Sequence, residues 1–322
     1  MQRFSLFFTS ILFWYQLSAQ QVWVRVDSLY QPIPSSMQVL KTTTPLQQKP
    51  FIAYAVIVSL KDRSLHFTAD TTFKRRFTPS QFFEKNNHPL LIVNTSFFSF
   101  TTHQNLNIVI KDHQLVAFQV HTIPGKGKDT LTYRHPIGSA IGITSSLQAD
   151  VAWVFTDSAA KYPLAIQSPI NPVKDSNASY STASFLQSLQ NEKVVAKKWK
   201  MQTAVGGGPV LLQAGKLLIA NNQELKFAGK AIEDKHPRTA IGYTEDRRLV
   251  ILAIEGRHPG VAEGATLAET AQLLLELGCV EALNLDGGGS TCLLINGKHT
   301  ITPSDKEGER AVPGVFVIQQ KN

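Results

Sequence analysis

The segment of this 322-residue chain with the clearest chemical potential is residues 284–291, which read Asn-Leu-Asp-Gly-Gly-Gly-Ser-Thr. Three consecutive glycines cost conformational entropy, so they are tolerated where the backbone needs a positive φ or another group approaches closely. Next to the carboxylate of Asp286, they allow amide N–H groups to point into one small space and form an anion-binding nest. The segment is not a P-loop, because the spaced glycines and the final Lys-Ser/Thr pair are missing. We expect it to hold a phosphate-bearing ligand rather than to be only a turn capped by Asp286, with candidate contacts Asn284, Gly287, Gly288, Gly289 and Ser290.

A second run of three glycines, Gly206, Gly207 and Gly208, precedes Pro209 at the end of an apolar stretch. One such run is weak evidence for a site. Two runs in one domain are stronger evidence, because they could form opposing walls of a single tight cleft.

Charged residues near expected strand ends are the other candidates. Arg238 follows His236 and precedes Thr239, and its guanidinium group offers a fixed fork of donors that matches phosphate geometry. Glu255 and Arg257 flank a glycine after the next apolar run. Arg310 follows Glu309 near the C-terminus. Each of these residues alone would more often be an ordinary solvated side chain.

Composition limits the class of protein without identifying it. The chain is 43% hydrophobic and 17% charged, which excludes collagen, coiled-coil and disordered classes. Its formal net charge of +8 admits three kinds of anionic partner: nucleic acid, an acidic lipid surface, or phosphate groups on a substrate.

The first 20 residues match a secretory signal peptide. A short basic start precedes an apolar run over residues 4–15, and residues 16–20 contain small side chains suited to cleavage. We therefore expect an exported protein, periplasmic, associated with the cell envelope, or secreted. Export and the lack of an RNA-recognition pattern argue against nucleic acid as a partner. No later stretch reaches the ~20 apolar residues of a transmembrane helix, so no integral membrane anchor is expected. The sequence leaves the oligomeric state open.

The elements that must position these residues are mostly strands. Residues 21–50 are predicted to hold a strand over 22–26 and then an irregular lead-in. Residues 51–322 are predicted to form one α+β domain, with mixed, mainly antiparallel sheets and a few helices packed on them. A helix is expected over residues 182–200, and a second begins at Thr266 with a capping box to Glu269. Strands are expected over 51–60, 89–93, 106–110, 114–120, 137–143, 149–155, 204–212 (broken by its glycines), 238–243, 249–255, 280–285 and 293–295.

The chain has two cysteines, Cys279 and Cys292, which could pair in an oxidising compartment or remain apart as two small buried residues. No HExxH, paired-Cys or EF-hand spacing is present, so neither a metal nor a cofactor is predicted, and the sequence leaves metal dependence open.

Taken together, these segments resemble the phosphodiester glycosidase family. The resemblance rests on residues 94–98, 206–209 with Gly215, 236–242, 255–257, 264–269, 284–291 and 309–310, whose order and spacing fit. It covers most of residues 50–320. The chain departs from the family pattern at Thr95 and Ser96, where two glycines are usual, at Glu255, where Asp is usual, and at Ala262, where Ser is common.

The resemblance implies hydrolysis of a sugar-1-phosphodiester, by cleavage of the bond between the anomeric carbon and oxygen, to leave a phosphomonoester. The leaving phosphate is weakly basic, so charge stabilisation matters more than protonation by a general acid. On this basis, Asp286 or Glu255 would act at the anomeric carbon. Arg238, with Arg310, would hold the phosphate together with the amides of residues 206–208 and 287–290. Asn94 and Thr239 would be polar positioning residues, and His236 and Arg257 would contact the substrate.

A competing interpretation is a non-catalytic module that binds a phosphate-containing envelope or extracellular polysaccharide. In that case the departures from the family pattern would reflect lost catalysis. The sequence does not rank Asp286 against Glu255, and it does not identify the sugar or the aglycone.

Overall fold

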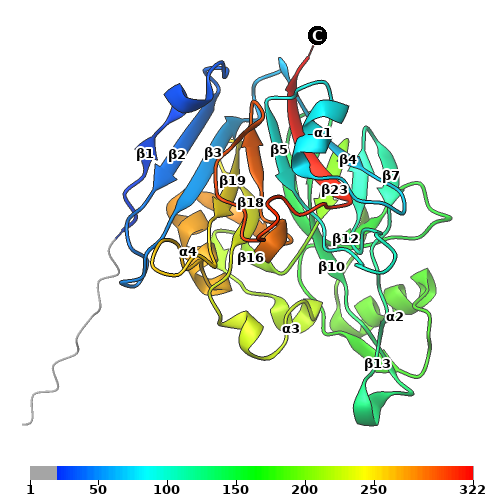
Figure 1. The fold of residues 1–322 in the computed structure, drawn as a ribbon. Coiled ribbons are helices and arrows are strands. Elements are labelled where there is room, and N and C mark those ends of the chain that lie inside the picture. Colours follow the sequence, from blue (N-terminus) through cyan, green and yellow to red (C-terminus); the bar gives the residue numbers. More distant parts are fainter. Residues whose placement is uncertain (1–19, 322) are drawn as a thin grey trace, which may run out of the picture.

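The computed structural model describes residues 20–321, and these form a mainly β, roughly α+β structure (Figure 1). The predicted signal peptide lies outside the described residues, except for its last position. Every strand pairing among the described residues is antiparallel, so the prediction of mixed sheets was wrong in that respect. No helix in residues 20–321 has both the length and the apolar character needed to cross a membrane.

The largest sheet has eight strands. In spatial order they are β1 (Val24–Arg25), β2 (Met37–Thr42), β3 (Ala53–Ser59), β19 (Arg248–Ile254), β18 (Arg238–Thr244), β20 (Cys279–Asn284), β16 (Val210–Gln213) and β17 (Lys216–Leu217). The region expected to be an irregular lead-in therefore contains β2, in which Met37, Val39 and Thr42 are buried.

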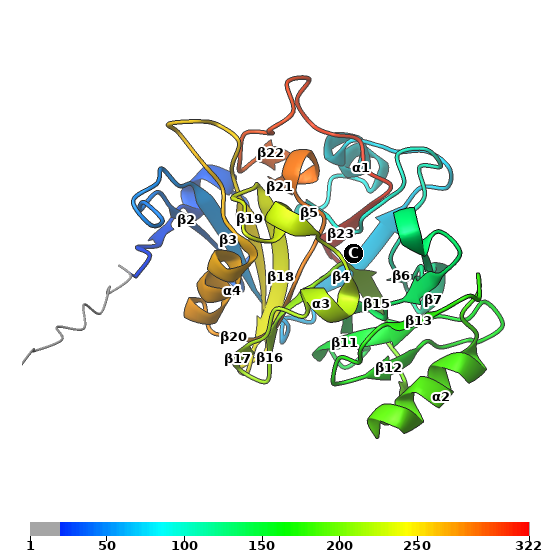
Figure 2. The same ribbon diagram turned by 90° about the horizontal axis from the view of Figure 1, so that it is seen from below.

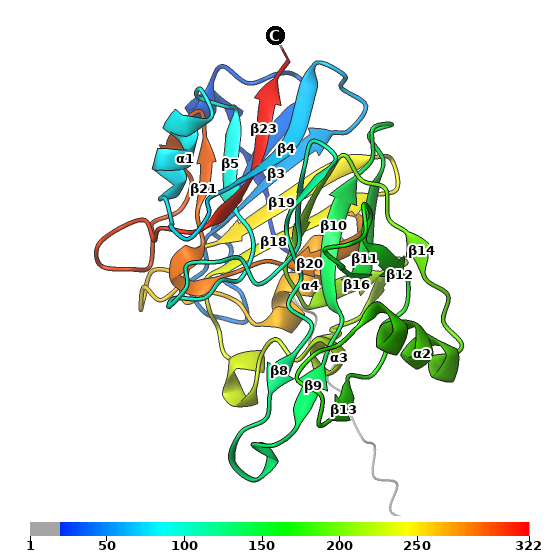
Figure 3. The ribbon, with the colours of Figure 1, turned by 90° about the vertical axis from the view of Figure 1, so that its right-hand side faces the viewer.

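Three further sheets complete the fold. A seven-stranded sheet has the order β14 (Lys197–Lys198), β12 (Leu164–Ile166), β11 (Ala149–Phe155), β10 (Gly138–Ile143), β15 (Thr203–Gly206), β6 (Val109–Lys111) and β7 (Gln114–Ala117). A five-stranded sheet has the order β22 (Lys298–His299), β21 (Leu293–Ile295), β5 (Leu91–Asn94), β23 (Gly314–Gln320) and β4 (Leu65–Thr71). A small sheet of β13 (Val173–Asp175), β9 (Tyr133–His135) and β8 (Ile123–Pro124) projects from one end (Figure 3).

The helices are short. They are α1 (Pro79–Lys85), α2 (Thr182–Glu192), α3 (Asn221–Glu224) and α4 (Leu267–Glu276), with 3₁₀ turns at Asp27–Tyr30, Gly127–Asp129, Gly229–Ile232 and Gly288–Ser290. The first predicted helix ends earlier than expected, because Lys193 turns into the left-handed region and the chain returns to a strand at β14.

Strand β3 shows how the core is organised. Tyr54, Val56 and Val58 enter the cluster between the large sheet and its neighbours, which also contains Phe67, Phe316 and Trp153. The alternate residues Ala53, Ala55 and Ile57 enter a second cluster on the opposite face of the large sheet. Because successive side chains of a strand point to opposite faces, a strand covered on both sides is apolar throughout.

Helix α4 covers that second face (Figure 2). Thr266 and Glu269 form the predicted capping box, with each side chain bonded to the other residue's backbone N–H. Leu267, Ala271 and Leu274 are fully buried against the sheet. Gly278 follows the helix with a φ of 85°, as expected of a residue that ends a helix.

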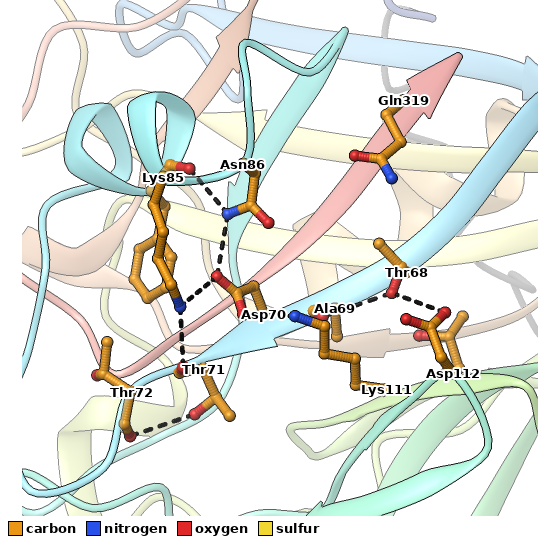
Figure 4. A network of polar contacts seen from close by, with 12 residues as sticks. Thr68, Ala69, Asp70, Thr71, Thr72, Lys85, Asn86, Lys111, Asp112 and Gln319 are labelled. Carbon is orange, nitrogen blue, oxygen red and sulfur yellow. Dashed lines mark hydrogen bonds and ion pairs between the residues drawn. The ribbon is translucent and has the colours of Figure 1, made fainter. Parts of the chain in front are cut away.

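An ion-pair network joins α1 to the five-stranded sheet (Figure 4). The buried carboxylate of Asp70 on β4 lies 2.6 Å from Lys85 Nζ and 2.8 Å from Lys111 Nζ, and it accepts a hydrogen bond of 3.0 Å from Asn86. Burial opposes ionisation of Asp70, but these donors outweigh it and hold the pKa of the carboxyl below its ordinary value. The network fixes α1 against β4.

Candidate functional site

The side chain of Asn94 joins three segments where β5 ends. Its Nδ2 donates a hydrogen bond of 2.6 Å to the carbonyl of Asp286, while its Oδ1 accepts from Thr239 Oγ1 at 2.8 Å and from Cys292 N at 3.0 Å. Asn94 and Thr239 are both fully buried. Their hydrogen bonds therefore hold the loop of residues 285–291 against β5 and β18.

Asn284 joins the two glycine-rich segments. Its Nδ2 donates to the carbonyl of Gly208 at 3.0 Å, and its own carbonyl accepts from Gly208 N at 2.7 Å. Asn284 is also fully buried, so its hydrogen bonds hold the two glycine-rich segments side by side. The chain changes sheets here, because β15 lies in the seven-stranded sheet and β16 in the eight-stranded one.

The amides of residues 206–208 are all used within the protein. Gly206 N donates to Ile108 O at 2.8 Å, and Gly207 N donates to Ser139 O at 3.0 Å. With Gly208 N bonded to Asn284, the prediction that these amides bind an anion was wrong. The glycines serve close packing instead, since a Cβ on Gly207 would lie 2.5 Å from the carbonyl oxygen of Asn284.

The glycines after Asp286 leave room for two guanidinium groups. A Cβ on Gly288 would lie 2.9 Å from Arg257 Nη2, and a Cβ on Gly289 would lie 2.1 Å from Arg310 Nη2. Gly288 also has a φ of 62°, and its N–H donates to Pro237 O at 2.9 Å. The loop backbone is therefore bordered by two guanidinium groups and, at Gly289, also by the carboxylate of Asp305, whose Oδ1 would lie 2.2 Å from a Cβ there.

Arg310 is held in place by Asp305. The pair is bidentate, with Arg310 Nε at 2.8 Å from Asp305 Oδ2 and Nη2 at 2.9 Å from Oδ1. Its guanidinium also lies over the ring of Phe100, 5.6 Å from the centroid. The sequence reasoning did not single out Asp305, and the only signal for it was an acidic residue shortly before an arginine.

Arg238 is 2% exposed and is held by main-chain carbonyls. Its Nε donates to Ala265 O at 2.9 Å and its Nη2 to Asp234 O at 3.1 Å. Burial, reinforced by the nearby charge of Arg257, lowers the pKa of Arg238 to about 10. Within residues 20–321 no carboxylate forms a direct ion pair with this cation, although the charges of Asp234 and Glu269 favour its protonated form.

The carboxyl group of Asp286 has a strongly shifted pKa. Burial raises its pKa to about 7, although the Ser290 hydroxyl, the Arg310 charge and the Gly287 amide all favour the ionised form. Its main-chain N–H donates to Thr95 O at 2.7 Å. A carboxyl group with such a pKa can exchange a proton near neutral pH.

Glu255 is placed differently. It is 5% exposed, and its Oε2 accepts a hydrogen bond of 2.9 Å from the main-chain N–H of Thr302. Arg257, two residues later, is exposed and has a φ of 63°, an uncommon backbone conformation for a residue other than glycine. The carboxylate of Glu255 thus helps to hold residue 302, while Arg257 reaches the glycine loop.

Several buried polar atoms around the loop have no partner within residues 20–321. They include Thr95 Oγ1, Ser96 Oγ, Thr291 Oγ1, Asn284 Oδ1 and His236 Nδ1. Burial lowers the pKa of His236, as do the charges of Arg238 and Arg257. Since buried polar groups are normally satisfied, such a group of atoms suits a site that binds water or a polar ligand.

A mainly apolar cavity of about 230 Å³ begins at Phe97, and none of the predicted site residues lines it. Its lining includes Phe97, Leu106, Glu224 and Lys226. Phe97 packs edge-on against Phe227, which in turn lies under the guanidinium of Arg238 at 5.5 Å. The rings of Phe97 and Phe227 therefore link the wall of the cavity to the guanidinium group of Arg238. A larger cavity of about 670 Å³, lined by Lys61, Arg247 and others, contains none of the predicted site residues.

The sequence profile described as phosphodiester glycosidase matches residues 87–319. The chain belongs to the phosphodiester glycosidase family. All the residues predicted for the site lie within this matched range.

Individual relatives match over shorter segments. The chain is 42% identical over 84 residues to the SPbeta prophage-derived uncharacterized protein YomE of Bacillus subtilis (strain 168), covering 26% of this chain and 13% of that protein. It is 41% identical over 68 residues to the N-acetylglucosamine-1-phosphodiester alpha-N-acetylglucosaminidase of Bos taurus, covering 21% and 12%. The matches thus span about an eighth of the length of these curated relatives.

Among solved structures, the fold is similar to that of the catalytic domain of the zebrafish N-acetylglucosamine-1-phosphodiester alpha-N-acetylglucosaminidase. The TM-score is 0.60 at 17% identity, over 90% of this chain and 85% of that chain. A hypothetical protein from Synechocystis gives a TM-score of 0.59 at 16% identity, over 89% and 62%. At these identities the likeness shows a shared fold.

Two of the departures from the phosphodiester glycosidase pattern lie directly beside the loop. Thr95 and Ser96 are buried, and their hydroxyl groups are among the atoms without a partner. Where glycines would leave open space, these two residues add polar side chains, which changes the chemistry available to a ligand.

Proposed function

We propose that this protein is a hydrolase that cleaves the glycosidic bond of a sugar-1-phosphodiester, releasing free sugar and a phosphomonoester. The observation that carries the proposal is the arrangement around Asp286: a carboxyl with a pKa of about 7, in a glycine loop bordered by Arg257 and Arg310. Membership of the phosphodiester glycosidase family supports the reaction class.

The reaction breaks the bond between the anomeric carbon and the phosphate oxygen. The bonding electrons stay on that oxygen, and the hydroxyl group of a water molecule joins the anomeric carbon. Negative charge develops on the departing phosphate, so fixed cations lower the barrier. Arg238 and Arg257 supply that charge without a direct carboxylate partner in residues 20–321, while Arg310 adds a cation that Asp305 already pairs.

Asp286 is proposed as the group that removes a proton from the attacking water. A base is most effective when its pKa lies near the working pH, because it is then largely ionised and still basic enough. Glu255 is the second candidate, but its Oε2 is already bonded to the main chain at Thr302. The cavity lined by Phe97 is proposed to hold the sugar or the group attached to the phosphate.

The test is to incubate the protein with a panel of sugar phosphodiesters, including UDP-N-acetylglucosamine and p-nitrophenyl sugar-phosphate diesters. The measured quantity is the free reducing sugar that is released. Asp286→Asn is expected to lower kcat by about 100-fold or more, in line with loss of a general base. Normal turnover by both Asp286→Asn and Glu255→Gln would overturn the assignment. No release from any substrate, together with tight retention on phosphate-containing polysaccharide, would instead identify a binding module.

Export is proposed as part of this function, on the pattern of residues 1–20. Expression of the full chain followed by cell fractionation and N-terminal sequencing would test it. The expected result is a mature protein outside the cytoplasm that starts near residue 21. Retention of residues 1–20 on a cytoplasmic protein would contradict the proposal.

A further inference from the structure

Cys292, His299 and Glu309 meet beside the glycine loop, although they come from three separate segments. Cys292 precedes β21, His299 ends β22, and Glu309 lies in the loop that leads to β23. One donor atom from each residue lies within 4.8 Å of the other two. This cluster plays no part in the proposed hydrolysis.

The distances within the cluster suit a shared ligand. Cys292 Sγ lies 3.9 Å from His299 Nδ1 and 3.8 Å from Glu309 Oε1, while His299 Nε2 lies 3.0 Å from the same carboxylate oxygen. Donors bound tetrahedrally to zinc, with bonds of about 2.0–2.3 Å, are about 3.3–3.6 Å apart. The contacts of His299 with Cys292 and with Glu309 involve different nitrogens of its ring, and only one of them would bind the ion. A shared ion therefore requires the imidazole ring to turn and the donor atoms, which lie within 4.8 Å of one another, to approach by up to about 1 Å.

We propose that Cys292, His299 and Glu309 form a binding site for a divalent, thiophilic metal ion of the zinc type. Thiolate and imidazole ligands select zinc-like ions, whereas magnesium and calcium require mainly oxygen ligands. His299 is exposed, so a fourth position can be taken by water.

A nucleophilic cysteine is the main alternative for the same three residue types. Cys292 is 3% exposed, however, and its side chain packs in the cluster of Phe82, Ile92 and Leu294 beneath α1. A substrate could not reach the sulfur in this arrangement. A small ion can reach the cluster through its two other donors, since His299 is exposed and Glu309 is half-buried.

The surrounding contacts suggest what the metal would do. Glu309 also accepts hydrogen bonds from Ser80, through N at 3.0 Å and Oγ at 2.7 Å, and it directly precedes Arg310. A bound ion would tie β21, β22 and α1 to the loop that carries Arg310 and Asp305. The site is therefore expected to order this loop and not to take part in the bond cleavage.

The experiment uses the full chain, stripped with a chelator and titrated with Zn²⁺ and with Co²⁺ as a spectroscopic probe. The expected result is one bound ion per chain, a sulfur-to-cobalt charge-transfer band in the near ultraviolet, and a higher Tm with Zn²⁺. Cys292→Ser is expected to weaken Zn²⁺ binding at least tenfold and to abolish the Tm increase. His299→Ala, at an exposed position, is expected to do the same.

The matched control is Cys279→Ala, which removes the other buried cysteine and should retain both the charge-transfer band and the Zn²⁺ affinity. Less than stoichiometric binding to the original protein would overturn the proposal, as would wild-type affinity in both Cys292→Ser and His299→Ala. Rapid alkylation of Cys292 by iodoacetamide in the folded protein would favour the nucleophile instead and would also overturn it.

Discussion

Asn94 at the end of β5 and Thr239 in β18 share a buried hydrogen bond of 2.8 Å, which connects the five-stranded sheet to the eight-stranded one. The same Asn94 side chain holds the carbonyl of Asp286, so the contact between two sheets also sets the position of the glycine loop. Asn94→Ala would leave the hydroxyl group of Thr239, which is buried, and the carbonyl of Asp286, which is half-buried, without this partner.

We therefore expect Asn94→Ala to lower the free energy of unfolding by about 1–3 kcal/mol, the usual cost of unsatisfied buried polar groups. It should also lower kcat more than tenfold, because the loop is displaced. Urea denaturation and steady-state kinetics would measure both effects. The exposed Asn222→Ala serves as the control and should change neither. Unchanged stability in Asn94→Ala would show that the loop is held by other contacts.

Asp70 provides a prediction about stability that is independent of the site. Asp70→Asn keeps the shape but removes the charge that Lys85 and Lys111 share (Figure 4). Because hydrogen bonds to charged groups are worth about 1.5–3 kcal/mol, a loss of that order in the free energy of unfolding is expected near pH 7.

The sign of the pH effect follows from the lowered pKa of Asp70. Its contribution to stability is present above the pKa of the unfolded state and is lost as the pH falls through the lower pKa of the folded state. The difference between the original protein and Asp70→Asn should therefore shrink in strong acid. Denaturation curves at pH 7 and pH 3 would test this. The control is Asp246→Asn, which removes the acid of an exposed ion pair with Arg248. An equal difference at both pH values would contradict the account.

Local signals in the sequence were sufficient for many elements of the fold. The apolar run over residues 51–60, the capping box at Thr266 and the hairpin of β18 and β19 follow from periodicity and turn chemistry, and all are present. The strand β2 was missed, because its burial depends on pairing with β3 rather than on its own composition. Helix α2 ends at Glu192, before Lys193, although the apolar pattern of the sequence continues to residue 199. The pairing of Lys197 and Lys198 with β12 depends on the tertiary structure and has no local signal.

The sequence predicted which candidate residues lie near one another better than it predicted their contacts. The glycine loop, Asp286 and the arginines are brought together as expected, whereas the amides of residues 206–208 are used in backbone contacts. Which N–H groups remain free depends on neighbouring strands, and spacing along the chain does not encode this. The absence of a familiar metal motif likewise gave no hint of the Cys292, His299 and Glu309 cluster, since the fold alone brings the three residues together. The two cysteines, whose pairing was left open, are both free and buried.

Arg310 is expected to act through its geometry as well as its charge. Arg310→Lys keeps a cation but loses the two parallel bonds to Asp305. Because a lysine cannot reproduce the planar fork, kcat/KM for a sugar phosphodiester should fall about tenfold or more, about 1.4 kcal/mol in transition-state binding. Arg25→Lys is the matched control, since it alters an exposed Arg–Asp pair. Wild-type kinetics in Arg310→Lys would leave Arg238 and Arg257 as the phosphate-binding cations.

The pKa of Asp286, about 7, makes two linked predictions. If Asp286 is the base, log kcat/KM should rise with pH with unit slope and level off near pH 7. His236 also lies nearby, and burial lowers its pKa, so it is the other group that could produce a transition. His236→Gln is therefore made in parallel and should retain the transition.

The second prediction concerns stability. The folded state favours protonated Asp286, so its contribution to stability is fully present below the ordinary pKa of an aspartate. That contribution is lost as the pH rises through about 7, the raised pKa of the folded state. Asp286→Asn, which is neutral at every pH, should therefore match the original protein near pH 4 and exceed it in Tm near pH 8. Thermal denaturation across this range would test the point, with Asp246→Asn as an exposed control whose pKa is shifted downward instead. A variant that is equally or less stable at pH 8 would mean that Asp286 is ionised without cost in the folded protein, and the base would then have to be sought at Glu255.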